Sequence, residues 1–305
     1  MATTKGSMFD PALVTDLISK VRGKSALASL SAQTPVPFNG LKEMTFSMDK
    51  EVDIVAEGGA KSEGGITVAP IVISPIKFEY GARISDEFMY AAEEEQLDIL
   101  TALNEGFARK VAKGFDLAAM HGINPRSGAA STVVGTNHFD GKVTSNTVTY
   151  ASATPDANLE AAIAQLGDND VTGMALSKTF GADMAKVKAN GVKVYPEFSF
   201  GASPQALNGI GVSVNSTVSG GTTKDHAIIG DFQNGFKWGY AKEIPLEIIQ
   251  YGDPDNSGKD LKGYNQIYIR AEVYLGWGIL LPDAFSIIKE ASSGGGSQET
   301  EASDE

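Results

Sequence analysis

Histidine is the residue type in this chain best suited to acid–base or metal chemistry, and it occurs at His121, His138 and His226. Such chemistry needs several nitrogen, sulfur or carboxylate groups that converge on one point. The three histidines are few and scattered, and His121 falls at the end of a predicted helix, where the negative end of the helix dipole favours it. The absence of cysteine also removes thiolate nucleophiles and thiolate metal sites. These groups therefore predict no metal site, no cofactor and no catalytic residue.

Motifs for nucleotide binding and for paired carboxylates fail on spacing. Gly23-Lys24-Ser25 resembles the end of a phosphate-binding loop, but the upstream glycine that such a loop requires is replaced by Ile18, within a helical pattern. The acidic run at residues 93–95 lies on a predicted helix, where adjacent side chains point in different directions. A solvated helix face, or an ion-pair partner for another subunit, explains this run better than acid–base catalysis.

A third motif resembles a calcium-binding loop around Gly258. The twelfth position of such a loop should supply a bidentate glutamate, but here it is Tyr264. A polar turn is therefore the better interpretation of its oxygen-bearing side chains, which are Asp253, Asp255, Ser257 and Asp260.

Composition indicates a folded protein that does not bind nucleic acid through general charge attraction. The 305 residues are 42% hydrophobic and carry a formal net charge of −13. Binding to nucleic-acid backbones depends on Lys and Arg, so this charge argues against it. The N-terminus lacks the apolar core of a signal peptide, and no apolar run reaches the roughly 18 residues of a membrane span. We therefore expect synthesis and residence in a cytoplasm.

A long β-hairpin is predicted over residues 43–80. Apolar residues alternate on both sides of a glycine-rich tip at 57–65. Arms of about 14 residues at about 3.3 Å per residue would reach roughly 45 Å, and an isolated ribbon of that length needs a surface to lie on. The alternative is that both arms are strands of a larger internal sheet, broken at Pro70 and Pro75.

A long helix is predicted over residues 86–121, with Ser85 as its N-cap. Apolar residues recur at steps of three or four, among them Phe107, Val111 and Phe115, and the helix would be about 54 Å long. Gly106 and Gly114 lie inside it, which predicts either a bend or close packing at each.

The remainder predicts a mixed domain followed by long strands. Loops and short strands are expected over 127–154, and the acidic tail at 291–305 should be disordered because it has almost no apolar content. The N-terminal arm contains an amphipathic helix within residues 10–30. Further helices are expected at 155–166 and within 175–188, and strands at 210–214, 227–232, 244–248 and 267–275.

The order of these elements resembles that of the major capsid proteins of tailed double-stranded DNA bacteriophages. The resemblance spans residues 10 to about 288, and its strength lies in the order and spacing of several motifs. These are 54–61 (IVAEGGAK), 77–88 (KFEYGARISDEF), 121–128 (HGINPRSG), 207–212 (LNGIGV), 229–232 (IGDF), 268–273 (YIRAEV) and 282–285 (PDAF).

The resemblance implies an α+β tailed-phage major capsid fold. The implied parts are an N-terminal arm at 1–42, an E-loop hairpin at 43–80, a P-domain at 81–153 and 242–278, and an A-domain at 154–241 and 279–290. It also implies a structural role without enzymatic activity. The protein would self-assemble as pentamers and hexamers into an icosahedral shell around phage DNA, in the host bacterial cytoplasm. Expected partners are a separate scaffolding protein, a portal and decoration proteins.

Contacts between subunits are expected along the hairpin. Apolar residues there should press on the next subunit, whereas charged residues should set the register of the contact more than its affinity. The candidate contact residues are Val52, Ile54, Glu57, Lys61, Glu63, Ile66 and Val68.

Three alternatives stay open at this point. Some relatives join an E-loop lysine to an asparagine of a neighbouring subunit, and Lys61 with Asn256 or Asn265 is the conceivable pair, although neither asparagine aligns with that chemistry. An encapsulin-like nanocompartment shell would share the fold but enclose a cargo enzyme. An oligomeric enzyme with a mixed domain would have to work without cysteine, a nucleotide loop or a convergent histidine site.

Overall fold

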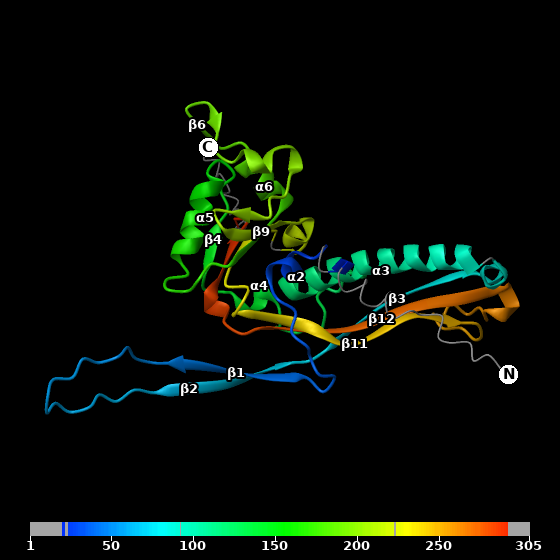
Figure 1. Cartoon of the computed structure of the whole chain (residues 1–305), viewed down its shortest axis with the longest axis horizontal. Coiled ribbons are helices and arrows are strands. Elements are labelled where there is room, and N and C mark those ends of the chain that lie inside the picture. Colours follow the sequence, from blue (N-terminus) through cyan, green and yellow to red (C-terminus); the bar gives the residue numbers. More distant parts are fainter. Residues whose placement is uncertain (1–19, 22–23, 92, 223, 292–305) are drawn as a thin grey trace, which may run out of the picture.

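The protein has an elongated, mixed α/β architecture in a computed structural model that describes residues 20–21, 24–91, 93–222 and 224–291 (Figure 1). A compact part is built on a six-stranded sheet, and a long helix with a three-stranded sheet extends from it. A two-stranded hairpin projects in the opposite direction from that helix. Half of the predicted N-terminal arm, including residues 1–19, and the predicted disordered tail from residue 292 on lie outside the described residues.

The extended part is a helix packed on an antiparallel sheet in the order β11-β12-β3 (Phe236–Ile249, Gln266–Ile279 and Ile76–Ser85). The predicted alternation on β12 is confirmed, because Ile267, Ile269 and Val273 are buried in one core with the apolar face of the helix. Phe115 of the helix lies 5.4 Å from Trp238 and 5.6 Å from Trp277, between ring centroids. A continuous core therefore joins this helix to two strands from the C-terminal third of the chain.

The long helix, α3, runs over Glu93–His121 and is 29 residues long, so its predicted start at residue 86 is wrong. Ser85 does cap a helix, but that helix is a 3₁₀ segment at Asp86–Tyr90. Phe88 is buried there, and Ala91 then takes extended backbone angles, which separates this segment from α3. The α-helix is consequently about 44 Å long. No described helix is long and apolar enough to cross a membrane.

The two glycines inside α3 differ in their surroundings. A bend or close packing was predicted at each, and close packing is confirmed at Gly114, where an added Cβ would lie 3.2 Å from Pro125 and 3.4 Å from Phe78. A Cβ added at Gly106 would meet nothing within 4 Å. The absence of a side chain at Gly114 thus lets α3 lie close to Phe78 and Pro125. Gly106 has no such packing role within the subunit.

Gly106→Ala should raise the free energy of unfolding by about 0.5–1 kcal/mol. A glycine in a helix interior costs about this much relative to alanine, and no neighbouring atom opposes the new methyl group. The measurement is the denaturant midpoint of unassembled subunits. Gly114→Ala is the matched control and should gain less or lose stability, so an equal gain in both would contradict the packing role of Gly114.

The compact part is a mixed sheet in the order β4-β13-β10-β5-β9-β8. Every residue of its strand β10 is buried, as the apolar run predicts, and the helices expected near 155–166 and within 175–188 are present. A second apolar core lies within this part. The strands are Thr147–Thr149 (β4), Phe285–Lys289 (β13), Asp225–Gly230 (β10), Gly173–Leu176 (β5), Ile210–Val214 (β9) and Ala206–Leu207 (β8), and the two helices are Pro155–Ala164 (α5) and Lys178–Met184 (α6).

Short elements connect these layers. The other described helices and strands are Ala26–Leu30 (α2), Phe139–Lys142 (α4), Lys188–Ala189 (β6) and Val192–Lys193 (β7), with 3₁₀ turns at Pro196–Gly201, Ser216–Ser219, Lys262–Tyr264 and Pro282–Ala284. Two predicted domain boundaries do not coincide with the sheets. The boundary predicted at residue 241, between the A-domain and the P-domain, falls inside β11. Strand β4 lies in the segment predicted for the P-domain, but it pairs with β13 in the six-stranded sheet.

The hairpin is shorter than predicted. Its strands, β1 (Leu41–Met48) and β2 (Ile66–Ile73), have eight residues each and pair only with one another. The predicted arm to residue 80 is wrong, because β3 begins at Ile76 and pairs with β12. Pro75 lacks the backbone N–H that would continue the ladder. The segment after Pro75 is therefore a strand of a larger sheet, as the alternative interpretation expected. The segment before Pro75 belongs to the hairpin.

A buried carboxylate connects the N-terminal segment to α3. Asp116 accepts hydrogen bonds from the Ser25 hydroxyl at 2.5 Å, the Ala26 and Leu27 amides at 2.9 and 3.3 Å, and the Thr217 hydroxyl at 2.9 Å. The first three partners form the N-terminus of α2, whose amides lack partners within the helix. Burial raises the pKa of Asp116 to about 6 in spite of these bonds, so the group is ionised at neutral pH.

Asp116→Ala should lower the free energy of unfolding by about 2–4 kcal/mol at pH 7.5. The substitution leaves the buried donors of α2 and Thr217 without their acceptor. Hydrogen bonds to a charged group stabilise by about 1.5–3 kcal/mol, and the burial of the Asp116 carboxylate cancels part of their combined contribution. Denaturant unfolding of the subunit measures the loss. Asp98→Ala removes an exposed carboxylate from the same helix and should change little. Similar small losses in both variants would contradict the anchoring role.

Candidate assembly interface

One face of the hairpin is apolar and exposed. In the register of β1 and β2, Phe46 pairs with Val68 and Met48 with Ile66, which places these side chains on the same face of the ribbon. Phe46 is 68% exposed and Met48 is 77% exposed, although both are large apolar residues. Apolar side chains grouped on one side of a protruding ribbon mark a surface that another molecule covers.

The base of the hairpin is anchored by the opposite face. Ile73, which pairs with Leu41, is fully buried, and it packs on β12 where Gly276 and Gly278 leave room for it. Lys237 of β11 also forms an ion pair with Glu43 at 2.8 Å. The hairpin is therefore anchored at its base. Its outer part is not packed against the described part of its own subunit.

The tip carries the remaining predicted contact residues. Val52 and Ile54 are 93% and 97% exposed and lie beyond the paired strands, so the prediction that they alternate on a strand is wrong. The charged candidates Glu57, Lys61 and Glu63 are exposed as well. The Asp49 side chain accepts a hydrogen bond from the Gly65 amide at 2.6 Å, which closes the loop where the strands end.

Sequence reasoning selected only part of this surface. The structure places the candidates Ile66 and Val68 beside Met44, Phe46 and Met48, which were not selected. The same two-residue alternation in the first arm was the available signal, but only the cross-strand register shows that both arms contribute to one face.

An apolar groove lies between α3 and the three-stranded sheet. It has a volume of about 380 Å³, and Tyr80 and Ile99 at its edge are 51% and 38% exposed. An adjoining groove of about 220 Å³ shares Phe107 and Lys110 with it. The helix and sheet thus leave a hollow, largely apolar strip on the surface of the extended part.

The motif that resembles a calcium loop is organised by an arginine. The Arg83 guanidinium donates to Asp255 at 2.5 and 2.9 Å and to Asp253 at 2.6 Å. Asp253 also accepts from the amides of Ser257 and Gly258, at 3.0 and 2.7 Å. The hydrogen bond from Arg83 lowers the pKa of Asp255 below its usual range. These contacts agree with the predicted polar turn, in which a side-chain cation meets the carboxylates.

The other sequence candidates lie apart from the hairpin. The Ser25 hydroxyl is engaged with Asp116 rather than placed in a phosphate-binding loop. Asn256 and Asn265 both have left-handed backbone angles in turns near β12. The side chains of the acidic run at 93–95 are outside the described residues. His121 ends α3 as predicted, but it meets two carboxylates from distant elements, which sequence reasoning missed.

Comparisons with known proteins agree on one family. The model of the phage capsid family matches residues 6–289. The chain is similar to a solved structure from Mycobacterium phage Ogopogo, with 35% sequence identity, a TM-score of 0.75, and coverage of 88% of this chain and 92% of that chain. For a structure from Gordonia phage Cozz the identity is 25%, the TM-score 0.70, and the coverage 88% and 86%. The solved capsid of a native GTA particle has the same fold at 15% identity, with a TM-score of 0.58 and coverage of 96% and 94%. A search of curated proteins found no match.

Proposed function

Since this chain belongs to the phage capsid family, as a major capsid protein that forms the shell of the virion head, we propose how its parts divide the work of assembly. The hairpin β1–β2 is the E-loop, α3 with the three-stranded sheet is the P-domain, and the six-stranded part is the A-domain. The segment before β1 is the N-terminal arm. These are structural roles, and the protein is not an enzyme.

The exposed apolar face of the hairpin carries this proposal. Met44, Phe46, Met48, Ile66 and Val68 have too few neighbours in their own subunit to be removed from water. In the shell, this face lies on the P-domain of the next subunit, over the apolar groove between α3 and the sheet. Each subunit then donates one hairpin and receives another, which is a head-to-tail contact that closes into rings.

Closed rings of five and six subunits would build an icosahedral shell around double-stranded DNA. A net charge of −13 disfavours tight attachment to the DNA backbone, which a container for DNA must avoid. Glu57, Lys61 and Glu63 at the hairpin tip set the register of neighbouring subunits through charge pairing more than through affinity. A scaffolding protein, a portal and decoration proteins complete the proposed set of partners.

The test is electron microscopy of the protein expressed alone, with light scattering on a size-exclusion column. Shells, tubes, or discrete rings of five or six subunits are the expected result. A subunit that stays monomeric or dimeric at high concentration would contradict unaided assembly.

A further inference from the structure

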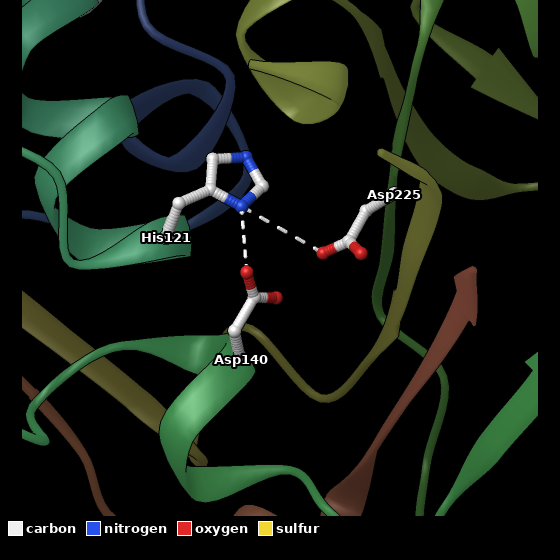
Figure 2. A group of neighbouring side chains, drawn as sticks. All are labelled: His121, Asp140 and Asp225. Carbon is white, nitrogen blue, oxygen red and sulfur yellow. Dashed lines mark hydrogen bonds and ion pairs between the residues drawn. The ribbon is translucent and has the colours of Figure 1, made fainter. Parts of the chain in front are cut away.

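Three ionisable side chains converge in the interior at the junction of the two parts of the molecule. His121 ends α3, Asp140 lies in α4, and Asp225 begins β10 (Figure 2). The Nδ1 atom of His121 lies 2.9 Å from Oδ2 of Asp140 and 3.7 Å from Oδ2 of Asp225. Their side chains are 1%, 11% and 0% exposed, so water contributes little to their solvation.

The hydrogen bonds made by His121 determine the protonation of Nδ1, the nitrogen that faces the carboxylates. Nε2 lies 3.0 Å from the carbonyl oxygen of Thr217, which can only accept, so Nε2 carries a hydrogen and donates it. Nδ1 faces the carboxylates and can hydrogen-bond to Asp140 only as an N–H, so without a metal ion the ring is an imidazolium. A metal ion at this position would replace the proton on Nδ1. Metal-binding histidines are held by this same arrangement, in which the far nitrogen donates to a carbonyl or carboxylate and the near one remains free to coordinate.

Asp225 is buried with few polar contacts to offset its loss of hydration. Neither of its carboxylate oxygens accepts a hydrogen bond from the described residues, although the side chain is fully buried and aimed at His121 (Figure 2). A buried carboxylate costs several kcal/mol unless a proton, a cationic group or a metal ion compensates its charge, and the nearest cationic group to Asp225 is His121, at 3.7 Å. A metal ion held between the three groups would compensate both carboxylates at once.

We propose that His121, Asp140 and Asp225 bind a divalent transition-metal ion, with Zn²⁺ as the best match. The ligand atoms lie within 4.8 Å of one another. A tetrahedral zinc ion with bonds of about 2.0–2.2 Å holds its ligands roughly 3.4 Å apart, and the observed 2.9 and 3.7 Å lie on either side of that spacing. One imidazole nitrogen with two carboxylates suits zinc better than calcium or magnesium, which prefer sets of oxygen ligands alone.

The ion would have a structural role. It would connect the end of α3, the short helix α4 and the first residue of β10, and these belong to the extended and the compact parts of the subunit. Lys289, the register partner of Asp225 on β13, adds a positive charge nearby. Metal ions bind the deprotonated forms of such ligands, so binding should weaken as the pH falls.

The experiment uses the purified full chain, treated with a chelator and then dialysed against ZnCl₂ or MgCl₂. Elemental analysis should find one zinc per chain and no stoichiometric magnesium. Zinc should raise the unfolding temperature by a few degrees, because a ligand that binds only the folded state stabilises it. Asp225→Asn, which keeps the shape of the side chain, should reduce zinc affinity at least tenfold and remove the thermal shift.

Two controls separate this site from adventitious binding and from misfolding. His226→Gln changes another buried histidine, which binds Glu290 at 2.7 Å outside the cluster, and it should retain the zinc response. Asp140→Asn provides a second ligand variant in case Asp225→Asn does not fold. The proposal is overturned if the wild-type chain binds no stoichiometric zinc, or if a folded ligand variant binds zinc as tightly as the wild type.

Discussion

Val68→Asp should abolish shell assembly while leaving a folded subunit in solution. Val68 lies at the centre of the apolar face of the hairpin, opposite Phe46, and it is 44% exposed in the subunit. Burial of a valine contributes about 1.5–3 kcal/mol, and burial of an unpaired carboxylate in its place costs more than that contribution. In the proposed assembly, every subunit makes this contact twice, once as donor and once as receiver. A moderate loss per contact therefore prevents closure.

The matched control is Thr67→Asp, which introduces the same residue one position away. Successive residues of a strand point to opposite faces, so this carboxylate lies on the other side of the ribbon, where Thr67 is already exposed. Electron microscopy and light scattering should find assemblies with Thr67→Asp and single subunits with Val68→Asp. Loss of assembly in both variants would contradict docking through one face and would indicate that neighbours enclose the whole ribbon.

The sequence predicted the strands of the hairpin but not all of their pairing. Two-residue alternation identified it because each strand carries its apolar side chains on one face. Alternation does not state which strand is the partner, and Ile76 and Phe78 alternate in the same way as Ile66 and Val68. Their membership of the β12 sheet depends on where the chain turns at Pro75 and on what β12 offers for pairing.

The buried cluster was beyond prediction for a related reason. His121 and Asp140 lie on two helices, 19 positions apart, and Asp225 lies on β10 of the six-stranded sheet. No local pattern relates these three residues, because only the packing of α3 against α4 and β10 brings them together (Figure 2). Helix α3 was predictable, since its core face repeats at helical spacing, whereas its start depends on the burial of Phe88.

Phe107→Asp should prevent folding altogether. Phe107 is 4% exposed and belongs to the core that α3 shares with β12. Truncation of a buried phenylalanine alone costs about 3–5 kcal/mol, and the aspartate adds an unpaired buried charge. Their sum approaches the whole stability of a typical domain, which is about 5–15 kcal/mol. Expression should yield insoluble protein, and any soluble fraction should lack a cooperative unfolding transition in circular dichroism.

Arg109→Asp is the control, because it places the same residue two positions further along α3 on the exposed side. It carries the same modest penalty of aspartate in a helix and should stay folded. Phe107 also lines the grooves in which we propose that the neighbouring hairpin docks, so two roles compete at this residue. A Phe107→Asp subunit that is soluble and cooperatively folded, yet does not assemble, would assign the residue to the interface. An insoluble chain beside a soluble Val68→Asp chain would separate the residues that fold the subunit from those that join subunits.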